Sequence, residues 1–467
     1  MKLLRLFLVG LLFTSSTEAA GLRIGAHAID VTPDLNVLLD GTISKPGPAK
    51  GVHDRLHARC VAFDDGNTRA AIAIIDNTMI AREILDDARN QIHEATGVPA
   101  RNLLLAATHT HSTPRALNIG QGKANLDYHQ KLATLIAKGV QLAFKNVRPA
   151  SIGWGSYDEP RFVFNRRWFV DDQLTPPNPF GEKTDRVWMN PPRGGLLNPA
   201  GPVDTEVYVV SAKKRSGEPI FLLGNYGLHY VGGTSRGQIS ADYFGVFSEH
   251  VKKLIATPDQ SPAFVGLMSN GTSGDVNAIN FAGERQRFPA YVRMKQIGKA
   301  IATNAAQVYR DMSFFDSGKI KVATKELTLG IRKPGAKRLA WARDTLAKTK
   351  PTARFPRNVI YANEAIALSR MPDTVNIMLQ AIRIDDLVIA AIPNEVFAET
   401  GLLIKAQSPF KSTFTIELAN GYHGYLPTAK QHEWGGYETW PARSSLLEVK
   451  AEEKIRRATL ELIHYLK

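Results

Sequence analysis

Residues 70–76, AAIAIID, and residues 103–108, LLLAAT, are two short apolar runs with the composition of buried β-strands. The segment Arg82–Ala95 lies between them and has the apolar periodicity of an amphipathic helix, as does the later segment Asp127–Lys145. Strand, helix, strand, helix is the element order of an α/β protein in which at least some strands pair in parallel. The sequence therefore predicts an α/β fold with a mixed β-sheet core flanked by helices.

Similar patterns continue along the rest of the chain. Residues 157–202 are rich in Pro, Gly, Asn and Arg, show little periodicity and are expected to form a long loop or flap. With no clear linker or repeat, we expect one catalytic domain over residues 21–467. The further strands are expected at Glu206–Ala212, Ile220–Tyr226, Ala263–Met268, Ile320–Leu327, Asn376–Ile382, Leu387–Ile392 and Thr413–Leu418, and the further helices at Tyr243–Ile255, Ala290–Arg310, Ala336–Ala347, Asn358–Leu368, Phe397–Ala406 and Leu447–Leu466.

Residues 1–20 have the pattern of a secretory signal peptide. Lys2 and Arg5 precede the apolar run 6–13, and small residues lead to Ala19 and Ala20, after either of which cleavage is acceptable. The apolar run is much shorter than the roughly 20 residues that a membrane-spanning helix needs. We therefore expect an exported protein, secreted or periplasmic, with no transmembrane segment.

Composition narrows the class of protein. The apolar and charged fractions are those of a globular chain, which excludes a disordered or fibrous protein. The net charge is +14, but Lys and Arg are scattered, so we expect no nucleic-acid binding and at most weak adsorption to anionic surfaces. Cys60 is the single cysteine, which rules out an intramolecular disulfide, and beside Val61 it is expected to be a buried packing residue. The oligomeric state is left open.

Two histidines follow the second apolar run, in the sequence THTHS at residues 108–112. Residues two apart on a strand point to the same face, so the rings of His109 and His111 could address one cavity without distortion of the backbone. Binding sites in open α/β sheets form at strand ends. The pair therefore predicts a metal site, and hydrogen-bonded core or loop histidines are the alternative.

Other polar side chains also follow predicted strands. His229 comes after the strand at 220–226, Glu395 after the strand at 387–392, and the phenol-rich segment NGYHGYLP, residues 420–427, after the strand at 413–418. Each has a purely structural alternative: a core histidine, an acid at a helix start, and packing tyrosines. The turn SNGTSGDVN at 269–277 could present backbone N–H groups to an anion, but it is neither a P-loop nor a nucleophile elbow.

Taken in order, these segments resemble the neutral/alkaline ceramidase family over nearly all of the chain after the leader. That resemblance implies the family's catalytic-domain fold and the hydrolysis of a ceramide-like amide. The matching pieces are GVHDRLHAR at 51–59, THTHS at 108–112, Asn165–Arg166, the strand leading to His229, SAD at 240–242, GDV at 274–276, PNE at 393–395 and N-x-Y-x-x-Y at 420–425.

The resemblance also implies a set of site residues. The implied ligands of a catalytic Zn²⁺ are His109, His229, Glu395 and Tyr425. Nitrogen and oxygen ligands with a position left for water agree with what catalytic zinc requires.

His111 would lie beside this metal as an acid/base group. Arg166 and Tyr437 would line the site, although the adjacent Arg167 leaves the register uncertain. Bound Zn²⁺ would lower the pKa of a water molecule to roughly 7 and polarise the substrate carbonyl. Arg166 or Tyr437 would then help to hold the oxyanion while His111 passes a proton to the leaving group.

Two departures from the family pattern bear on the substrate. The family sequence Gly-Asp-Val-Ser-Pro-Asn reads GDVNAI at 274–279, so Asn277 replaces a serine of the site, where it could orient water or substrate. The family's C-terminal immunoglobulin-like domain is also expected to be absent.

These departures leave the substrate open between lipid-derived and glycan-derived acyl compounds. One alternative is a zinc hydrolase of glycan-linked esters, amides or lactones, and another is a catalytically inactive exported binding protein. The residues that would suit sugars or acidic groups are Arg166, Arg167, Trp168, Trp434 and Trp440.

Overall fold

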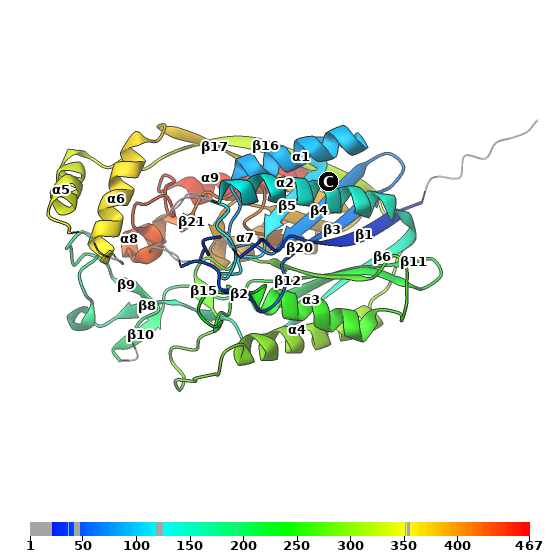
Figure 1. Cartoon of the computed structure of the whole chain (residues 1–467), viewed down its shortest axis with the longest axis horizontal. Helices are drawn as coiled ribbons and strands as arrows, with labels where there is room; N and C mark the ends of the chain where they lie inside the picture. The colour runs from blue at the N-terminus through cyan, green and yellow to red at the C-terminus, as the bar shows by residue number, and fades with distance from the viewer. Residues whose placement is uncertain are drawn as a thin grey trace, which may run out of the picture.

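Two β-sheets pack face to face in the middle of the molecule, and helices cover the outer face of each (Figure 1). The layers therefore run helix, sheet, sheet, helix. This computed structural model describes residues 21–35, 37–41, 47–117, 125–192, 194–350, 352 and 355–467. The predicted signal peptide, residues 1–20, lies outside the described residues.

The larger sheet has eight strands in the order β14-β12-β11-β6-β1-β3-β4-β5. Strands β4 and β5 pair in parallel, as do β12 and β14, and the other neighbours are antiparallel. The strands are β1 Arg23–Asp30, β3 His57–Asp64, β4 Arg69–Ile75, β5 Leu103–Ala107, β6 Arg148–Asp158, β11 Glu206–Lys214, β12 Pro219–Tyr226 and β14 Val265–Asn270.

The second sheet has four strands in the order β16-β17-β18-β20. Strands β18 and β20 pair in parallel, and the other neighbours are antiparallel. The bounds are β16 Ile320–Gly330, β17 Thr374–Ile384, β18 Leu387–Ala391 and β20 Ser412–Ile416. Both sheets are thus mixed, as the sequence predicted.

Side-chain alternation along the strands divides the core into layers. In β4, Ile72 and Ile74 lie between the sheets, in one buried cluster with Ile389 and Phe414 of the second sheet. The intervening residue Ala73 belongs to the cluster on the other face, under α1 and α2. Helices α3 and α4 cover β11, β12 and β14, and α7 and α9 cover the second sheet. The helices are α1 Arg82–Thr96, α2 Leu126–Lys145, α3 Asp242–Ile255, α4 Val292–Asp311, α5 Ala336–Ala347, α6 Arg357–Arg370, α7 Ala398–Gln407, α8 Ala429–Trp434 and α9 Ala451–Tyr465.

The prediction of a long loop over residues 157–202 is wrong in part. This segment contains a three-stranded sheet in the order β10-β8-β9 and a short strand β7 that pairs with β15. These strands are short, and their partners are fixed by contacts distant in sequence, so local periodicity does not reveal them. The bounds are β7 Phe164–Asn165, β8 Arg167–Val170, β9 Val187–Met189, β10 Leu196–Pro199 and β15 Val276–Asn277.

The segment Glu417–Asn420 joins the two sheets. It leaves β20 and runs between two edge strands of the large sheet: Glu417 N–H donates to Asn270 O at the end of β14 (3.2 Å), and Ala107 N–H of β5 donates to Leu418 O (3.1 Å). This crossing brings the ends of β5, β12, β18 and β20 to one place. The short strands β19 Glu395–Val396 and β21 Tyr425–Leu426 pair in parallel there.

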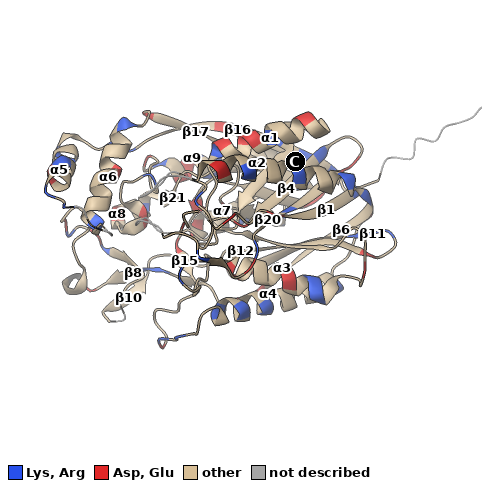
Figure 2. Cartoon of the chain, in the orientation of Figure 1, with Lys and Arg blue, Asp and Glu red and all other residues tan. Residues whose placement is uncertain are grey.

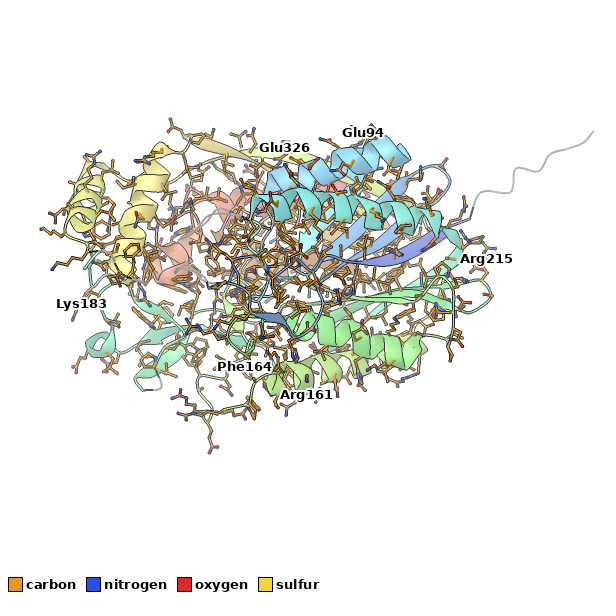
Figure 3. The ribbon with its side chains drawn as sticks, viewed as in Figure 1. Glu94, Arg161, Phe164, Lys183, Arg215 and Glu326 are labelled. Carbon is orange, nitrogen blue, oxygen red and sulfur yellow. The ribbon has the colours of Figure 1, made fainter. Side chains whose placement is uncertain are left out.

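The surface and the single thiol agree with the sequence analysis. Lys and Arg are spread over several elements, with a row along α4 (Figure 2). Side chains surround the ribbon on all sides in Figure 3, where Phe164 and Lys183 mark the segment with the short strands. Cys60 is buried in β3, and burial raises the pKa of its thiol to about 12, which makes it a packing residue. Within the described ranges, no helix is long and apolar enough to cross a bilayer.

Candidate metal centre

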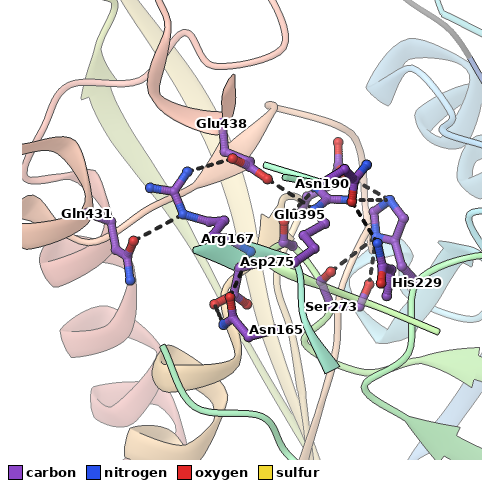
Figure 4. Close-up of polar contacts among 12 residues, drawn as sticks. Asn165, Arg167, Asn190, His229, Ser273, Asp275, Glu395, Gln431 and Glu438 are labelled. Atoms are coloured by element: carbon purple, nitrogen blue, oxygen red, sulfur yellow. Dashed lines mark hydrogen bonds and ion pairs between the residues drawn. The ribbon is translucent and has the colours of Figure 1, made fainter. Parts of the chain in front are cut away.

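Three imidazoles converge where β5 and β12 end. The Nε2 atom of His109 lies 3.2 Å from Nε2 of His229 and 3.2 Å from Nε2 of His111. His109 and His229 are 1% exposed, so this cluster is inside the protein. Figure 4 shows His229 beside Ser273 and close to Glu395. The structure therefore brings together both histidines of the THTHS motif and the predicted third one.

The route by which the two motif histidines meet differs from the prediction. Strand β5 ends at Ala107, and His109 has a left-handed backbone conformation with φ 74°. The rings thus converge through a turn and not through the same-face alternation of a continuing strand. A left-handed conformation costs a non-glycine residue about 1–2 kcal/mol and is concentrated at functional sites. Leu418 (φ 53°) and Asn420 (φ 67°), in the crossing segment, have the same conformation.

Backbone carbonyls fix the tautomers of two of these rings. His109 Nδ1 lies 2.8 Å from Thr78 O, and His229 Nδ1 lies 3.1 Å from Ser273 O. A carbonyl oxygen can only accept, so Nδ1 carries the proton in both rings and Nε2 keeps its lone pair. Two such lone pairs facing each other at 3.2 Å repel unless a positive group lies against them, and the Arg166 guanidinium, with Nη1 3.0 Å from His229 Nε2, is one such group and a metal cation would be another.

Glu395 supplies the negative charge of the centre. Its Oε1 accepts a hydrogen bond from the Tyr422 hydroxyl (2.7 Å), whereas Oε2 is buried without a hydrogen-bond donor and lies 3.3 Å from His109 Nε2. Burial acts to raise the pKa of Glu395, but the interactions with His109, Arg166 and Tyr422 outweigh it and lower that pKa. Glu395 is therefore an anion with one oxygen left free.

These distances fit a metal ion. Ligand nitrogens and oxygens at about 2.0–2.1 Å from a tetrahedral metal lie about 3.3 Å from one another. From His109 Nε2, the distances to His111 Nε2, His229 Nε2 and Glu395 Oε2 are 3.2, 3.2 and 3.3 Å. The three histidines form a possible metal-binding group, with their ligand atoms all within 4.8 Å of one another. The residues present thus suit a small cation that prefers nitrogen and carboxylate ligands.

His111 is held differently from the other two rings. Its imidazole stacks on Tyr230, with ring centroids 3.6 Å apart and an interplanar angle of 14°. Burial, together with the neighbouring His109 ring and the charge of Arg166, lowers the pKa of His111 well below the usual range, so the ring is neutral at pH 7. By distance alone His111 is as close to His109 as His229 is.

The structure resolves the register of the two arginines. Arg166 faces the centre: its Nη1 lies 3.0 Å from His229 Nε2, and Nη2 donates to Gly274 O (2.8 Å). Arg167 points the other way, where it donates to Gln431 Oε1 (3.1 Å) and Glu438 Oε2 (2.5 Å), as Figure 4 shows. Glu438 joins the two, because its Oε1 accepts from Arg166 Nε (3.0 Å).

Two phenols complete the wall next to Arg166. The Tyr425 ring lies 5.5 Å from the Arg166 guanidinium carbon and 5.8 Å from the Tyr437 ring. Tyr425 reaches this place because β21 pairs with β19, which puts it directly opposite Glu395. Burial and the charge of Glu395 raise the pKa of both phenols, against the opposing effect of Arg166. Both tyrosines are therefore neutral at pH 7 unless a metal ion binds the oxygen.

Asn277 is tied into the adjoining loops. Its Nδ2 donates to Asn190 Oδ1 (2.8 Å), and its Oδ1 accepts from the backbone N–H of Ile279 (2.9 Å). Asn190 itself has a positive φ of 51°. Asn277 thus holds the turn at Asn190, within the segment 157–202, in place.

Several supporting residues escaped the sequence analysis. Ser273 carries the acceptors for His229, and buried Glu417 accepts from Ser273 Oγ (2.5 Å) and from the Val396 N–H (2.7 Å). Glu417 could have been noticed, since it is a charged residue within the apolar strand predicted at 413–418. Tyr422 lies in the phenol-rich segment 420–427, but its bond to Glu395 was not predicted, and Glu438 left no signal because its partners Arg166 and Arg167 are far away in the sequence.

The GDV turn, residues 274–276, has a structural role that predicts a pH effect. Asp275 accepts from the N–H of Ala398 at the start of α7 (2.8 Å), and burial raises its pKa from 3.8 to about 7. Because the folded pKa exceeds the unfolded one, the stabilisation is complete below about pH 4 and is lost as the pH rises to about 7. Asp275→Asn should remove a slope of about 1.4 kcal/mol per pH unit from denaturant unfolding measured between pH 4 and 7. The exposed Asp259→Asn is the control, and equal slopes in wild type and Asp275→Asn would contradict the prediction.

Known proteins resemble this chain in part of its sequence and in its fold. No family model matches the chain. Neutral ceramidase B and neutral ceramidase A of Dictyostelium discoideum are 25% and 24% identical to it over 276 and 280 residues, which is 56% of this chain and 36% of each relative. The chain thus matches little more than a third of the length of these relatives.

Solved structures match over more of the chain. The neutral ceramidase of Pseudomonas aeruginosa superposes with a TM-score of 0.71 at 18% identity, covering 96% of this chain and 74% of that one. A ceramidase complexed with C2 gives 0.71 at 17% identity, covering 96% and 75%. At such identities the likeness shows the fold, and it confirms the predicted mixed α/β architecture.

Proposed function

We propose that this chain, a divergent neutral-ceramidase-like protein, is an exported zinc-dependent hydrolase that cleaves an N-acyl amide bond in a ceramide-like substrate. One observation carries the proposal. The Nε2 atoms of His109 and His229 and the free Oε2 atom of Glu395 lie together in a buried space. Export rests on the leader pattern of residues 1–20.

The metal ligands that we propose are His109, His229, Glu395 and Tyr425. The first two present Nε2 because carbonyl groups hold their Nδ1 protons, and Glu395 presents Oε2 because Tyr422 occupies the other oxygen. When bound, Zn²⁺ supplies a water of lowered pKa and polarises the carbonyl of the substrate.

The remaining residues stabilise the negative charge that develops on the substrate and transfer protons. Arg166, anchored by Glu438 and Gly274, directs Nη1 to the centre and can stabilise the oxyanion that develops on the carbonyl oxygen, with the Tyr437 hydroxyl as a second donor. His111 is neutral at pH 7 and stacked in a fixed orientation, so it can accept a proton and pass it to the leaving amine. Asn277 orients the loop on this side of the site.

The packing favours this function over the glycan-linked alternative. Of the residues that would suit sugars at the metal centre, Arg167 is fully buried in its pairing with Glu438, and Trp440 is buried with Tyr361 in a small aromatic cluster. Trp168 donates its indole N–H to Asn165 O (3.0 Å). Arg167 and Trp440 are therefore packed inside the protein and are not free to stack on a substrate.

Metal dependence provides the direct test. The purified protein should hydrolyse an N-acyl sphingoid amide, lose at least about 10³-fold of that activity after chelation and regain it with Zn²⁺, because unassisted water has a pKa of about 15.7. Release of the sphingoid amine is measured by mass spectrometry. Matched glycan-linked acetyl esters serve as the comparison panel. Turnover that survives chelation, or turnover confined to the glycan-linked panel, would overturn the proposal.

A further inference from the structure

A second hollow lies at the end of the molecule formed by α5 and α6. It is an open cavity of about 400 Å³, bounded by the segment 177–181, by Trp341 of α5 and by Arg357 and Asn358 of α6. Figure 1 shows α5 and α6 side by side at the left, and Lys183, just beyond the segment, is labelled there in Figure 3. None of the proposed metal ligands lines this cavity.

Arg357 brings an unbalanced positive charge to the cavity. Arg357 is exposed, and its guanidinium carbon lies 5.8 Å from the Trp188 ring and 5.6 Å from the Trp440 ring, within cation–π range. Among the residues that the structure describes, no carboxylate pairs with it. The nearby acids are engaged elsewhere: Glu182 binds Arg338 (3.1 Å), and Asp185 accepts the Trp440 indole N–H (2.6 Å).

The start of α6 adds further donors to the same wall. Pro356 precedes the helix and offers no side-chain cap, and the first intrahelical bonds run from Val359 and Ile360 to Pro356 O. The backbone N–H groups of Arg357 and Asn358 therefore point out of the helix end, where its dipole is positive. The cavity wall thus combines a guanidinium, free amide N–H groups and the Asn358 side chain.

Aromatic rings form the opposite wall, and they are fixed in place. Phe180 and Trp341 lie with ring centroids 5.4 Å apart at 73°, and the Arg338 guanidinium carbon lies over the Phe180 ring, 3.5 Å from its centroid. Asn178 orients Phe180, because its Oδ1 accepts from the backbone N–H groups of Phe180 and Glu182 (both 3.0 Å). Flat apolar faces next to directional donors are typical of sites for small ring compounds.

We infer that this cavity binds a small ring compound bearing a carboxylate or sulfate group, the chemistry of an acidic sugar. The ring packs against Trp341, and the anionic group accepts from Arg357 and the α6 amides. Trp440 connects the cavity to the candidate metal centre, since it contacts Tyr361 (5.4 Å) on one side and Tyr437 (5.9 Å) on the other. The inference itself does not depend on the proposed hydrolysis.

Two isosteric probes test the proposal. Methyl β-D-glucuronide should bind the full-length protein, measured by ligand-observed NMR titration, whereas methyl β-D-glucoside, which lacks the carboxylate, should bind at least about tenfold more weakly. Cyclohexanecarboxylate reports whether the hydroxyls of a sugar are needed. Equal binding of the two glycosides, or binding of neither, would overturn the inference.

Variants locate the binding. Arg357→Gln should weaken glucuronide binding about tenfold or more, while Arg343→Gln, an exposed charge change on α5 away from the cavity, should not. Circular dichroism verifies that both variants are folded. His109→Ala should leave glucuronide binding intact, which separates this site from the proposed metal centre. Unchanged binding in Arg357→Gln would place the ligand elsewhere and contradict the assignment.

Discussion

His109→Ala is expected to yield a folded protein without stoichiometric metal, and its activity should fall by at least about 10³-fold. His109 Nε2 is the atom from which the other candidate ligands are 3.2–3.3 Å away, so its loss leaves the remaining donors without a common centre. Metal content by mass spectrometry and amide hydrolysis by amine release measure the two effects.

His111→Ala should behave differently, because we place His111 beside the metal. It should keep most of the metal and lose about 10²–10⁴-fold in turnover, the usual contribution of a positioned acid/base group. The reverse pattern, metal lost in His111→Ala and kept in His109→Ala, would exchange the roles of the two histidines. Thermal unfolding of both variants controls for misfolding, since His109 sits on a left-handed backbone position.

The second large effect, a loss of metal affinity, is expected from substitutions of Tyr425 and Tyr422. Tyr425→Phe removes a proposed ligand oxygen and should weaken metal binding by more than about 100-fold. Tyr422→Phe removes only the 2.7 Å hydrogen bond to Glu395 Oε1 and should weaken metal binding about 10–100-fold. Both variants lose one hydroxyl from the same segment, so each controls for the other's effect on packing.

Competition with a chromophoric chelator measures both affinities. A larger loss in Tyr422→Phe than in Tyr425→Phe would show that Tyr425 is not a ligand. It would also favour His111 as the fourth ligand, since its Nε2 already lies 3.2 Å from His109 Nε2.

Apolar runs and helical periodicity predicted much of the fold. The strand expected at 103–108 is β5, the helix at 82–95 is α1, and the helix expected at Ala336–Ala347 coincides with α5. The strands β1, β3 and β6 were missed because their residues are small, mixed or Gly-rich, and pairing with neighbouring strands stabilises them.

Only some residues of the candidate site could be predicted from the sequence. Strand ends gave His109, His229 and Glu395 as candidates, because polar residues after apolar strands can be recognised locally. The turn at His109 and the opposite directions of the Arg166 and Arg167 side chains could be recognised only in the structure. Neither has a local cause, since each depends on a carboxylate or carbonyl group far away along the chain.

Because of the crossing at Glu417–Asn420, the candidate centre depends on the folding of the whole chain. Two of its proposed ligands come from the first half of the chain and two from the last quarter, and they meet only after both sheets have docked along this crossing. Such long-range contacts are slow to form, because closing long loops costs chain entropy. A metal held there would act as a cross-link between distant parts of the chain, and its binding free energy would add directly to the stability of the native state.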